Sequence, residues 1–200
     1  MSSNLLNPSF YKRTAKEVAR SLIGTILVSR IAGLRVSGMV VETEAYLATR
    51  DAASHGTQGP NRKNRSMFGP AGRAYVYPIH ARYCFNAVTG IEGIASAVLI
   101  RAVEPIDGIK VMQQRRQRES LKLLTSGPAR LCEAFALNRQ QDGISLTTRR
   151  TTWLEQNPAF TADPKSLRAT RRIGVTSAKN LKLRFVLRGN LFVSGPRYLG

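Results

Sequence analysis

Two glutamates, Glu42 and Glu44, stand at the end of an apolar run in a chain that has few acids. Tyr46 follows two positions later, and His55 lies a short loop further on. Residues two apart on a strand point to the same face of a sheet, so we expect the two carboxylates to lie side by side. They could bind a metal ion together, or one could be buried as a general base while a salt bridge fixes the other.

The spacing of the remaining residues argues against several classes of site. The chain has no Walker loop, no dinucleotide-binding glycine pattern, no GxSxG nucleophile elbow and no zinc spacing of Cys and His. A metal-dependent nuclease or phosphatase would need clustered carboxylates, and 12 acids with only Glu42 and Glu44 paired fit that poorly. Cys84 and Cys132 lie far apart in apolar surroundings, which indicates core residues in a reducing compartment.

Charge is the strongest signal in the composition. Lys and Arg number 31 against 12 Asp and Glu, which gives a formal net charge of +19. Such a surface attracts polyanions and favours nucleic acid as the partner. The weaker alternatives are an anionic membrane surface, a solubilising charge excess and a ribosome-associated protein. No apolar run is long enough to span a membrane, and the first residues lack the order of a secretory signal. We therefore expect a cytoplasmic protein associated with the bacterial nucleoid.

Aromatic rings gather in the segments beside the glutamates. Tyr75 and Tyr77 share one strand face, and Tyr83 and Phe85 share another. Nucleic-acid bases stack on such rings, and a carboxylate in an aromatic cleft can act as a general base. Together these features favour a pocket that receives a base taken out of the double helix.

Each of these features also has a purely structural interpretation. An aromatic stripe on strands is more often core than a platform for bases. His55 could be a solvated loop residue, Glu44 could simply pair with Arg101, and residues 62–65 could be a solvated basic face. The residues alone leave these alternatives open.

Strand and helix patterns are interspersed without a regular βαβ rhythm. We expect helices over 14–24, from Pro105 to the basic run 113–118, and from Pro128. We expect strands over 25–28, 34–46, 73–88, which is broken or bent near Pro78, 95–103 and 183–193. Residues 47–72 read as a long loop, which inside a compact domain is usually functional or disordered, and 139–172 read as irregular. This pattern predicts a single α+β domain over residues 1–200, built around an antiparallel sheet.

The motifs and their order resemble one known family, the alkyladenine (3-methyladenine) DNA glycosylases. The resemblance runs from about residue 10 to residue 193, through VETEAYL, DAASH, NRKNRSMFGPAGRAYVYPIH, YCFN, VLIRAVEPIDG, SGPARLCEAFAL, RIGV and LRFVLRG. It implies one compact mixed domain with a curved antiparallel sheet flanked by helices. It also implies a DNA glycosylase of base excision repair that flips alkylated or deaminated purines out of duplex DNA and hydrolyses the N-glycosidic bond.

The resemblance assigns roles at the reacting centre. Glu44 matches the general base that activates the attacking water, and Arg101 matches an arginine that helps to hold this water. Ile173 matches the position whose main-chain carbonyl completes the surroundings of the water. No lysine matches a Schiff-base nucleophile, which implies a monofunctional enzyme without lyase activity.

A second set of matches would surround the flipped base. Tyr46 and Tyr77 match rings that sandwich it, and His55 matches a residue that closes the pocket and offers a hydrogen bond. Asn86 matches an asparagine that discriminates sterically against the exocyclic amine of guanine. Because an alkylated purine is cationic, aromatic faces would attract it.

The hairpin after the YVY strand departs from the family pattern. Family members usually carry a tyrosine there that fills the gap left by the flipped base, whereas this chain reads YPIHARYCFN and is one residue shorter. His80 falls nearest the position of this wedge, and Arg82 could share its task. We expect Arg62 and Arg65 to contact the DNA backbone, and 113–118 and 165–172 to bind phosphate in general.

The resemblance thus predicts a monomer that acts on double-stranded DNA containing damaged purines, with no metal and no cofactor. A domain of the same fold that binds nucleic acid without catalysis is the alternative. Glu44 and Arg101 discriminate between the two, because a binder has no need of a carboxylate aimed at a phosphate-rich ligand.

Overall fold

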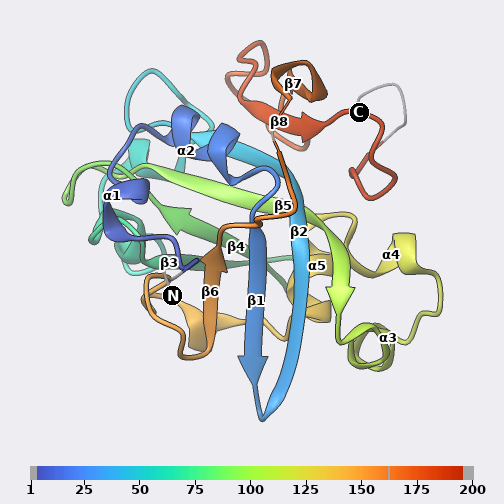
Figure 1. Cartoon of the computed structure of the whole chain (residues 1–200). Coiled ribbons are helices and arrows are strands. Elements are labelled where there is room, and N and C mark those ends of the chain that lie inside the picture. The colour runs from blue at the N-terminus through green and yellow to red at the C-terminus, as the bar shows by residue number, and fades with distance from the viewer. Residues whose placement is uncertain (1–3, 162, 196–200) are drawn as a thin grey trace.

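A long curled strand, β2, runs through the centre of the sheet (Figure 1). In the computed structural model, which describes residues 4–161 and 163–195, β2 pairs with β5 along one edge and with β1 and β8 along the other, always antiparallel. The sheet order is β3-β4-β5-β2-β1-β6, and β8 pairs with both β2 and β7. The strands are β1 Ile26–Ile31, β2 Leu34–Tyr46, β3 Ala74–Ile79, β4 Arg82–Val88, β5 Ala97–Asp107, β6 Thr152–Glu155, β7 Leu167–Thr170 and β8 Arg184–Leu187.

Register shifts between β2 and β5 accompany the curl of the sheet. They fall between Ser37 and Gly38 and on both sides of Glu42. An irregularity of this kind bends a strand and strengthens its twist. The predicted α+β domain with a curved antiparallel sheet is therefore confirmed, while residues 1–3, 162 and 196–200 of the predicted range lie outside the described residues.

Short helices pack around the sheet. The α-helices are α1 Pro8–Tyr11, α2 Ala15–Leu22, α3 Ile109–Arg116, α4 Leu121–Thr125 and α5 Pro128–Ala134, and the 3₁₀ turns are η1 His55–Gln58, η2 Arg65–Phe68, η3 Arg139–Gln141 and η4 Pro164–Ser166. α2 begins as expected at Thr14, whose side chain accepts from the Glu17 amide while the Glu17 carboxylate accepts from Thr14. It buries Val18 and Leu22, and the Thr43 hydroxyl of β2 donates to its Ala19 carbonyl at 2.8 Å.

The core has two parts. The larger part lies between the sheet and the helices and includes Leu22, Val40, Phe85 and Phe135. The smaller part lies under the 47–72 loop and consists of Met67, Tyr75, Val88, Ala95 and Ala97, with Tyr46, Phe68 and Tyr77 packed against it. The long loop is thus anchored by Met67, which is 2% exposed.

The strand expected over 73–88 is broken near Pro78, as predicted: β3 ends at Ile79, the chain reverses at His80 and Ala81, and β3 and β4 form a hairpin. Pro78 itself continues β3, and the prediction about a second proline was wrong. Pro105 does not begin a helix, because β5 continues to Asp107 and α3 starts only after Gly108. Pro105 faces Gly38 at one of the register shifts, where a missing N–H group does not interrupt a regular ladder.

The second half of the chain is more regular than its sequence indicated. β6 and β7 lie in the segment that was expected to be irregular, and each has four residues and forms by pairing with β1 and β8. The strand expected over 183–193 is confined to Arg184–Leu187. Over residues 4–161 and 163–195, no helix has both the length and the apolar character that crossing a membrane requires.

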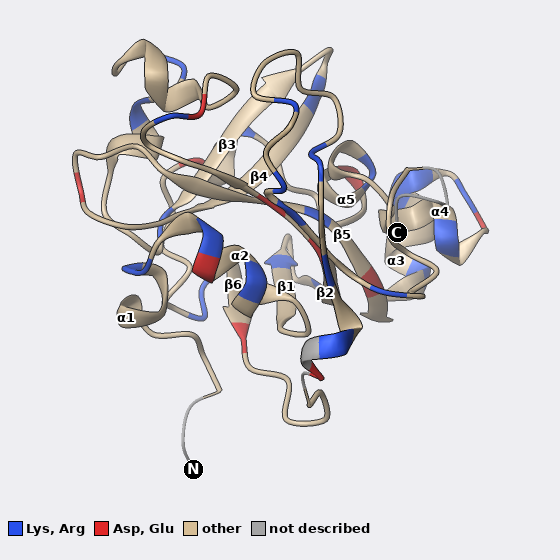
Figure 2. Cartoon of the chain, turned by 90° about the horizontal axis from the view of Figure 1, so that it is seen from above, with Lys and Arg blue, Asp and Glu red and all other residues tan. Residues whose placement is uncertain are grey.

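Lys and Arg occur on the helices and loops around the sheet, α3 and α4 among them (Figure 2). Some of these cations serve the fold. In the basic run 113–118, Arg115 donates to the Ala134 carbonyl of α5 at 3.0 Å, and Arg116 pairs with Glu133 of the same helix. In the run 165–172, Arg172 is buried. The two runs are therefore not uniformly available to phosphate.

Candidate active site

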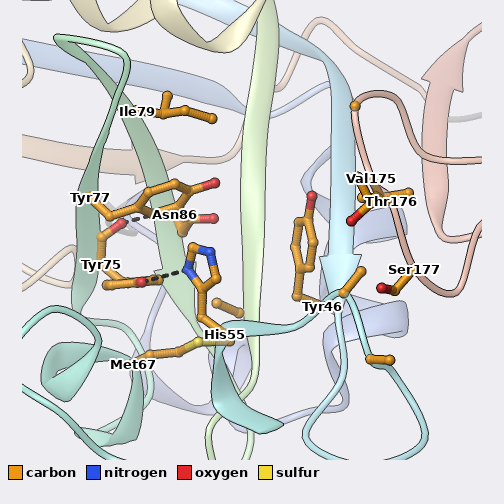
Figure 3. Close-up of a pocket in the computed structure, with 14 residues that line it drawn as sticks. Tyr46, His55, Met67, Tyr75, Tyr77, Ile79, Asn86, Val175, Thr176 and Ser177 are labelled. Carbon is orange, nitrogen blue, oxygen red and sulfur yellow. Dashed lines mark hydrogen bonds between the residues drawn. The ribbon is translucent and has the colours of Figure 1, made fainter. Parts of the chain in front are cut away.

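An aromatic cavity of about 280 Å³ opens where β2 ends, beside the first turn of the 47–72 loop (Figure 3). One wall carries His55, Tyr75, Tyr77 and Asn86, from η1, β3 and β4. Tyr46 from the end of β2 and the segment 174–177 form the facing wall. The expected alternation along β3 brings Tyr75 and Tyr77 to the same side, so the rings line a cavity as well as packing on the smaller core.

The first wall is held by contacts between its own members. His55 Nδ1 and the Tyr75 hydroxyl lie 2.8 Å apart, and the His55 ring meets Tyr77 edge-on with centroids 4.6 Å apart. The Asn86 amide donates to the Tyr75 carbonyl at 2.9 Å. His55 is therefore held in place as part of the cavity lining, although the residue as a whole remains exposed to solvent.

Burial determines the protonation states of this wall. It lowers the pKa of His55, so the imidazole is neutral at pH 7. It also raises the pKa of Tyr75, which keeps its hydroxyl protonated for the hydrogen bond with His55. The wall thus presents rings without a formal charge to the cavity.

Glu44 is fully buried, and each of its oxygens has a partner. Oε2 accepts from the Tyr46 hydroxyl at 2.9 Å, while Oε1 accepts from the Ile173 amide at 2.8 Å and lies 3.3 Å from Arg101 Nη1. The carboxylate therefore lies one hydrogen bond from a ring that lines the cavity. The contact from Ile173 is through its amide; the role expected for its carbonyl stays a prediction.

Glu42 lies beside Glu44 and shares Arg101 with it, as the expected common face requires. Arg101 Nε donates to Glu42 Oε1 at 2.9 Å, and Arg184 Nε donates to the same oxygen at 2.6 Å. The Ser194 amide and hydroxyl donate to the two Glu42 oxygens at 2.7 and 3.0 Å. Glu42 is thus enclosed by four donors and anchors Ser194, whereas Glu44 contacts Tyr46, a ring that lines the cavity.

A buried ion pair that the sequence did not indicate supports Tyr46. The Asp51 carboxylate receives two hydrogen bonds from Arg172, at 2.6 and 2.7 Å, and both side chains are fully buried. The Arg172 guanidinium lies 4.7 Å from the centre of the Tyr46 ring and also donates to the Ala45 carbonyl at 3.0 Å. Asp51 and Arg172 belong to the DAASH and RRIGV stretches, but their separation of 121 positions gave no signal that they pair.

The loop that carries His55 is fixed by two further residues. The buried Asn64 side chain donates to the carbonyls of His55 and Gly59 at 3.0 and 2.9 Å. A Cβ on Gly56 would lie 2.7 Å from the Ala95 side chain, so only glycine permits this approach of η1 to the segment that precedes β5. Neither residue was identified from the sequence.

The residues expected to contact DNA lie at the surface beside the cavity. His80 and Ala81 form the exposed two-residue turn of the β3–β4 hairpin, and Ile79, which precedes them, lines the cavity. Arg82 is half exposed and pairs with Glu133.

Arg62 and Arg65 are exposed. Arg62 lines a second groove, of about 670 Å³, together with Lys63 and Arg139. His55 and Tyr77 line both the groove and the cavity, so the two adjoin. Arg65 lines neither of them. The cavity therefore opens next to a cationic surface.

The site combines an uncharged aromatic cavity, a buried carboxylate held by hydrogen bonds, and a cationic groove. Such a site suits a planar, electron-poor ring that is part of a polyanion, because the aromatic faces attract the ring and the groove attracts the negative charge. The chain belongs to the family described as Methylpurine-DNA glycosylase (MPG), whose family model matches residues 9–191. It is therefore a DNA glycosylase by family.

Curated relatives agree with this assignment. A protein of Rhodopirellula baltica is 44% identical over 97% of this chain and 84% of its own length, and one of Methanoculleus marisnigri is 42% identical over 94% and 98%. A protein of Koribacter versatilis is 40% identical over 96% and 93%. All three are named "Putative 3-methyladenine DNA glycosylase".

Proposed function

We propose that this protein is a monofunctional DNA glycosylase that receives alkylated or deaminated purines, flipped out of duplex DNA, in the cavity beside Tyr46. The observation that carries the proposal is the buried Glu44 carboxylate, which is held by Tyr46, Ile173 and Arg101 next to a cavity lined by rings. The names of the curated relatives support a substrate of the 3-methyladenine type.

In the proposed reaction, a water oxygen attacks C1′ of the sugar while the bond from C1′ to the purine nitrogen breaks. The electron pair of that bond leaves with the base, and Glu44 accepts the proton of the water. Arg101 and the Ile173 main chain would position this water. An alkylated purine is cationic and leaves as a neutral molecule, whereas a deaminated purine leaves as an anion that takes up a proton from the surrounding water.

The aromatic residues would select the base. Tyr46 and Tyr77 lie on facing walls and would stack on its two sides, at roughly 1–3 kcal/mol for each contact. Neutral His55 would offer a hydrogen bond to the base, and Asn86, whose amide is fixed on the Tyr75 carbonyl, would exclude the exocyclic amine of guanine. His80 or Arg82 at the hairpin would fill the gap in the duplex.

Substitution of Glu44 by Gln tests the proposal. Glu44→Gln keeps the shape of the side chain but removes the proton acceptor, so single-turnover release of base from alkylated or hypoxanthine-containing duplex should fall by about 10²–10⁴-fold. Binding to the same duplex should persist. Base release near the wild-type rate in the variant would contradict the assignment of Glu44.

Glu42→Gln is the matched comparison, because it changes the neighbouring carboxylate on the same face. Two buried guanidinium groups would lose the carboxylate between them, so the free energy of unfolding should fall by roughly 3–5 kcal/mol. Below the melting temperature, the rate of base release should fall far less than in Glu44→Gln. A wild-type protein that binds the duplex but releases no base would favour the non-catalytic alternative.

A further inference from the structure

The Asp51–Arg172 pair stands directly behind the ring that the proposed function places against the base. Arg172 is fully buried and does not line the cavity, whereas Tyr46 does. The guanidinium, 4.7 Å from the centre of the ring, therefore covers the face of Tyr46 that is turned away from the cavity. A base stacked on the open face would be separated from a positive charge by the thickness of one aromatic ring.

Asp51 neutralises this charge. Burial would raise the pKa of its carboxyl, but the hydrogen bonds from Arg172 and from the Leu47 amide hold the pKa below its ordinary value. An arginine remains protonated in proteins. The pair is thus an ionised couple without net charge at neutral pH.

The substrates of the proposed function differ in the charge that would face this couple. A purine alkylated at a ring nitrogen is cationic in DNA, whereas hypoxanthine is neutral. If Arg172 lost its counter-ion, its charge behind Tyr46 would repel the cationic base. It would also weaken the attraction between the Tyr46 ring and the base, because both cations would interact with the same π system. Hypoxanthine would not be repelled, and the negative charge that develops on it as it leaves would be attracted by the unpaired guanidinium.

We propose that the Asp51–Arg172 pair is a specificity-determining element, which keeps the region behind Tyr46 electrically neutral and so admits cationic purines beside neutral ones. The proposal rests on the proposed function and deepens it. The two residues act through Tyr46 and are positioning residues, because neither lines the cavity.

The test compares the single-turnover rates of release of 7-methylguanine and of hypoxanthine from otherwise identical duplexes at pH 8. Asp51→Asn leaves the Arg172 charge in place and should lower the ratio of the two rates roughly tenfold, as expected for one added charge about 8 Å away. Arg172→Gln leaves the Asp51 charge and should raise the ratio. The double variant Asp51→Asn/Arg172→Gln should return the ratio to near its wild-type value, even if both rates are low.

Loss of structure alone cannot produce this pattern, because it would slow both reactions and shift the ratio in one direction at most. If either single variant is poorly folded by thermal unfolding, the other decides alone, since its predicted shift has a defined sign. Asp107→Asn is the matched control: it also adds one positive charge, but Asp107 pairs with Arg35 near the opposite end of β2, so the ratio should not change.

An unchanged ratio in the folded single variants would overturn the proposal and assign the pair a structural role only. That result is distinct from failure of the proposed function, in which the wild-type protein releases neither base. A ratio that shifts in the same direction in both single variants would also overturn it.

Discussion

Glu42 and Glu44 show how two identical side chains on one face of a strand come to differ. Both reach Arg101, yet Glu42 is enclosed by Arg184 and Ser194, while Glu44 receives the Tyr46 hydroxyl. Burial and the neighbouring Glu44 raise the pKa of Tyr46, which keeps that hydroxyl a donor. The difference between the two acids depends on contacts with residues 142 and 152 positions away, which no local pattern reveals.

The neutral state of His55 gives a prediction with a defined sign. Burial lowers its pKa, so protonation begins below the ordinary value of about 6.5. A protonated ring would repel a cationic base, and affinity of the Glu44→Gln variant for a 7-methylguanine duplex should therefore fall as the pH is lowered from 7 to 5. Because the unfolded chain takes up this proton at a higher pH than the folded one, the free energy of unfolding should fall over the same range.

His55→Gln in the Glu44→Gln background is the control for this titration. The imidazole is then absent, so the difference in affinity between the cationic duplex and a hypoxanthine duplex should no longer depend on pH. A pH dependence that survives the substitution would assign the titration to another group.

At the scale of elements, prediction from the sequence succeeded where a periodic pattern and a local signal coincide. β2 was predicted with its observed bounds, and α2 has its capping residues Thr14 and Glu17. β6 and β7 were missed because a strand of four residues is too short to show a clear alternation of apolar and polar residues. Each forms by pairing with a neighbouring strand, β1 or β8.

The residues of the candidate site also fall into those that the sequence predicted and those that it did not. Its aromatic side and Glu44 lie on strands, and the resemblance of their motifs identified them. The Asp51–Arg172 pair and the hydrogen bonds of Asn64 to the His55 loop were missed, because these contacts depend on the folded path of the loops, which no local pattern in the sequence reveals.

The β3–β4 hairpin is an element in which strain and function can be separated. Its two turn residues, His80 and Ala81, have φ angles of 45° and 61°, a conformation typical of a type I′ turn and best suited to Asn-Gly. Ala81→Gly should relieve strain and raise the free energy of unfolding by up to about 1 kcal/mol, as measured by denaturant titration. It should leave base flipping unchanged.

His80→Ala is the matched variant, because it keeps the strained turn but removes the ring. If His80 fills the gap in the duplex, the fluorescence that reports flipped ethenoadenine should be lost in His80→Ala and retained in Ala81→Gly. Equal flipping by both variants would place the wedge elsewhere, with the half-exposed Arg82 as the next candidate.

At the scale of the whole molecule, the charge of +19 is not spread as one uniform binding surface. Arg101, Arg172 and Arg184 are buried against carboxylates, and Arg82 and Arg116 both pair with Glu133. The cations that line the groove beside the cavity are Arg62, Lys63 and Arg139, and Arg139 also pairs with Asp142. Binding to DNA should therefore depend on a subset of the basic residues.

Salt dependence can identify that subset. Each phosphate contact adds about 0.9 to the slope of log affinity against log salt concentration, because binding displaces condensed cations from the duplex. Arg62→Ala and Arg65→Ala should each lower the slope by about 1 and weaken binding to damaged and undamaged duplexes alike, as measured by fluorescence anisotropy at several salt concentrations. At saturating protein, the single-turnover rate of base release should not change, because neither side chain lines the cavity. Arg35→Ala removes the same charge at the far end of β2 and should leave the slope unaltered. If all three variants lowered the slope equally, DNA would be attracted by the net charge of the protein and not by a surface at the cavity.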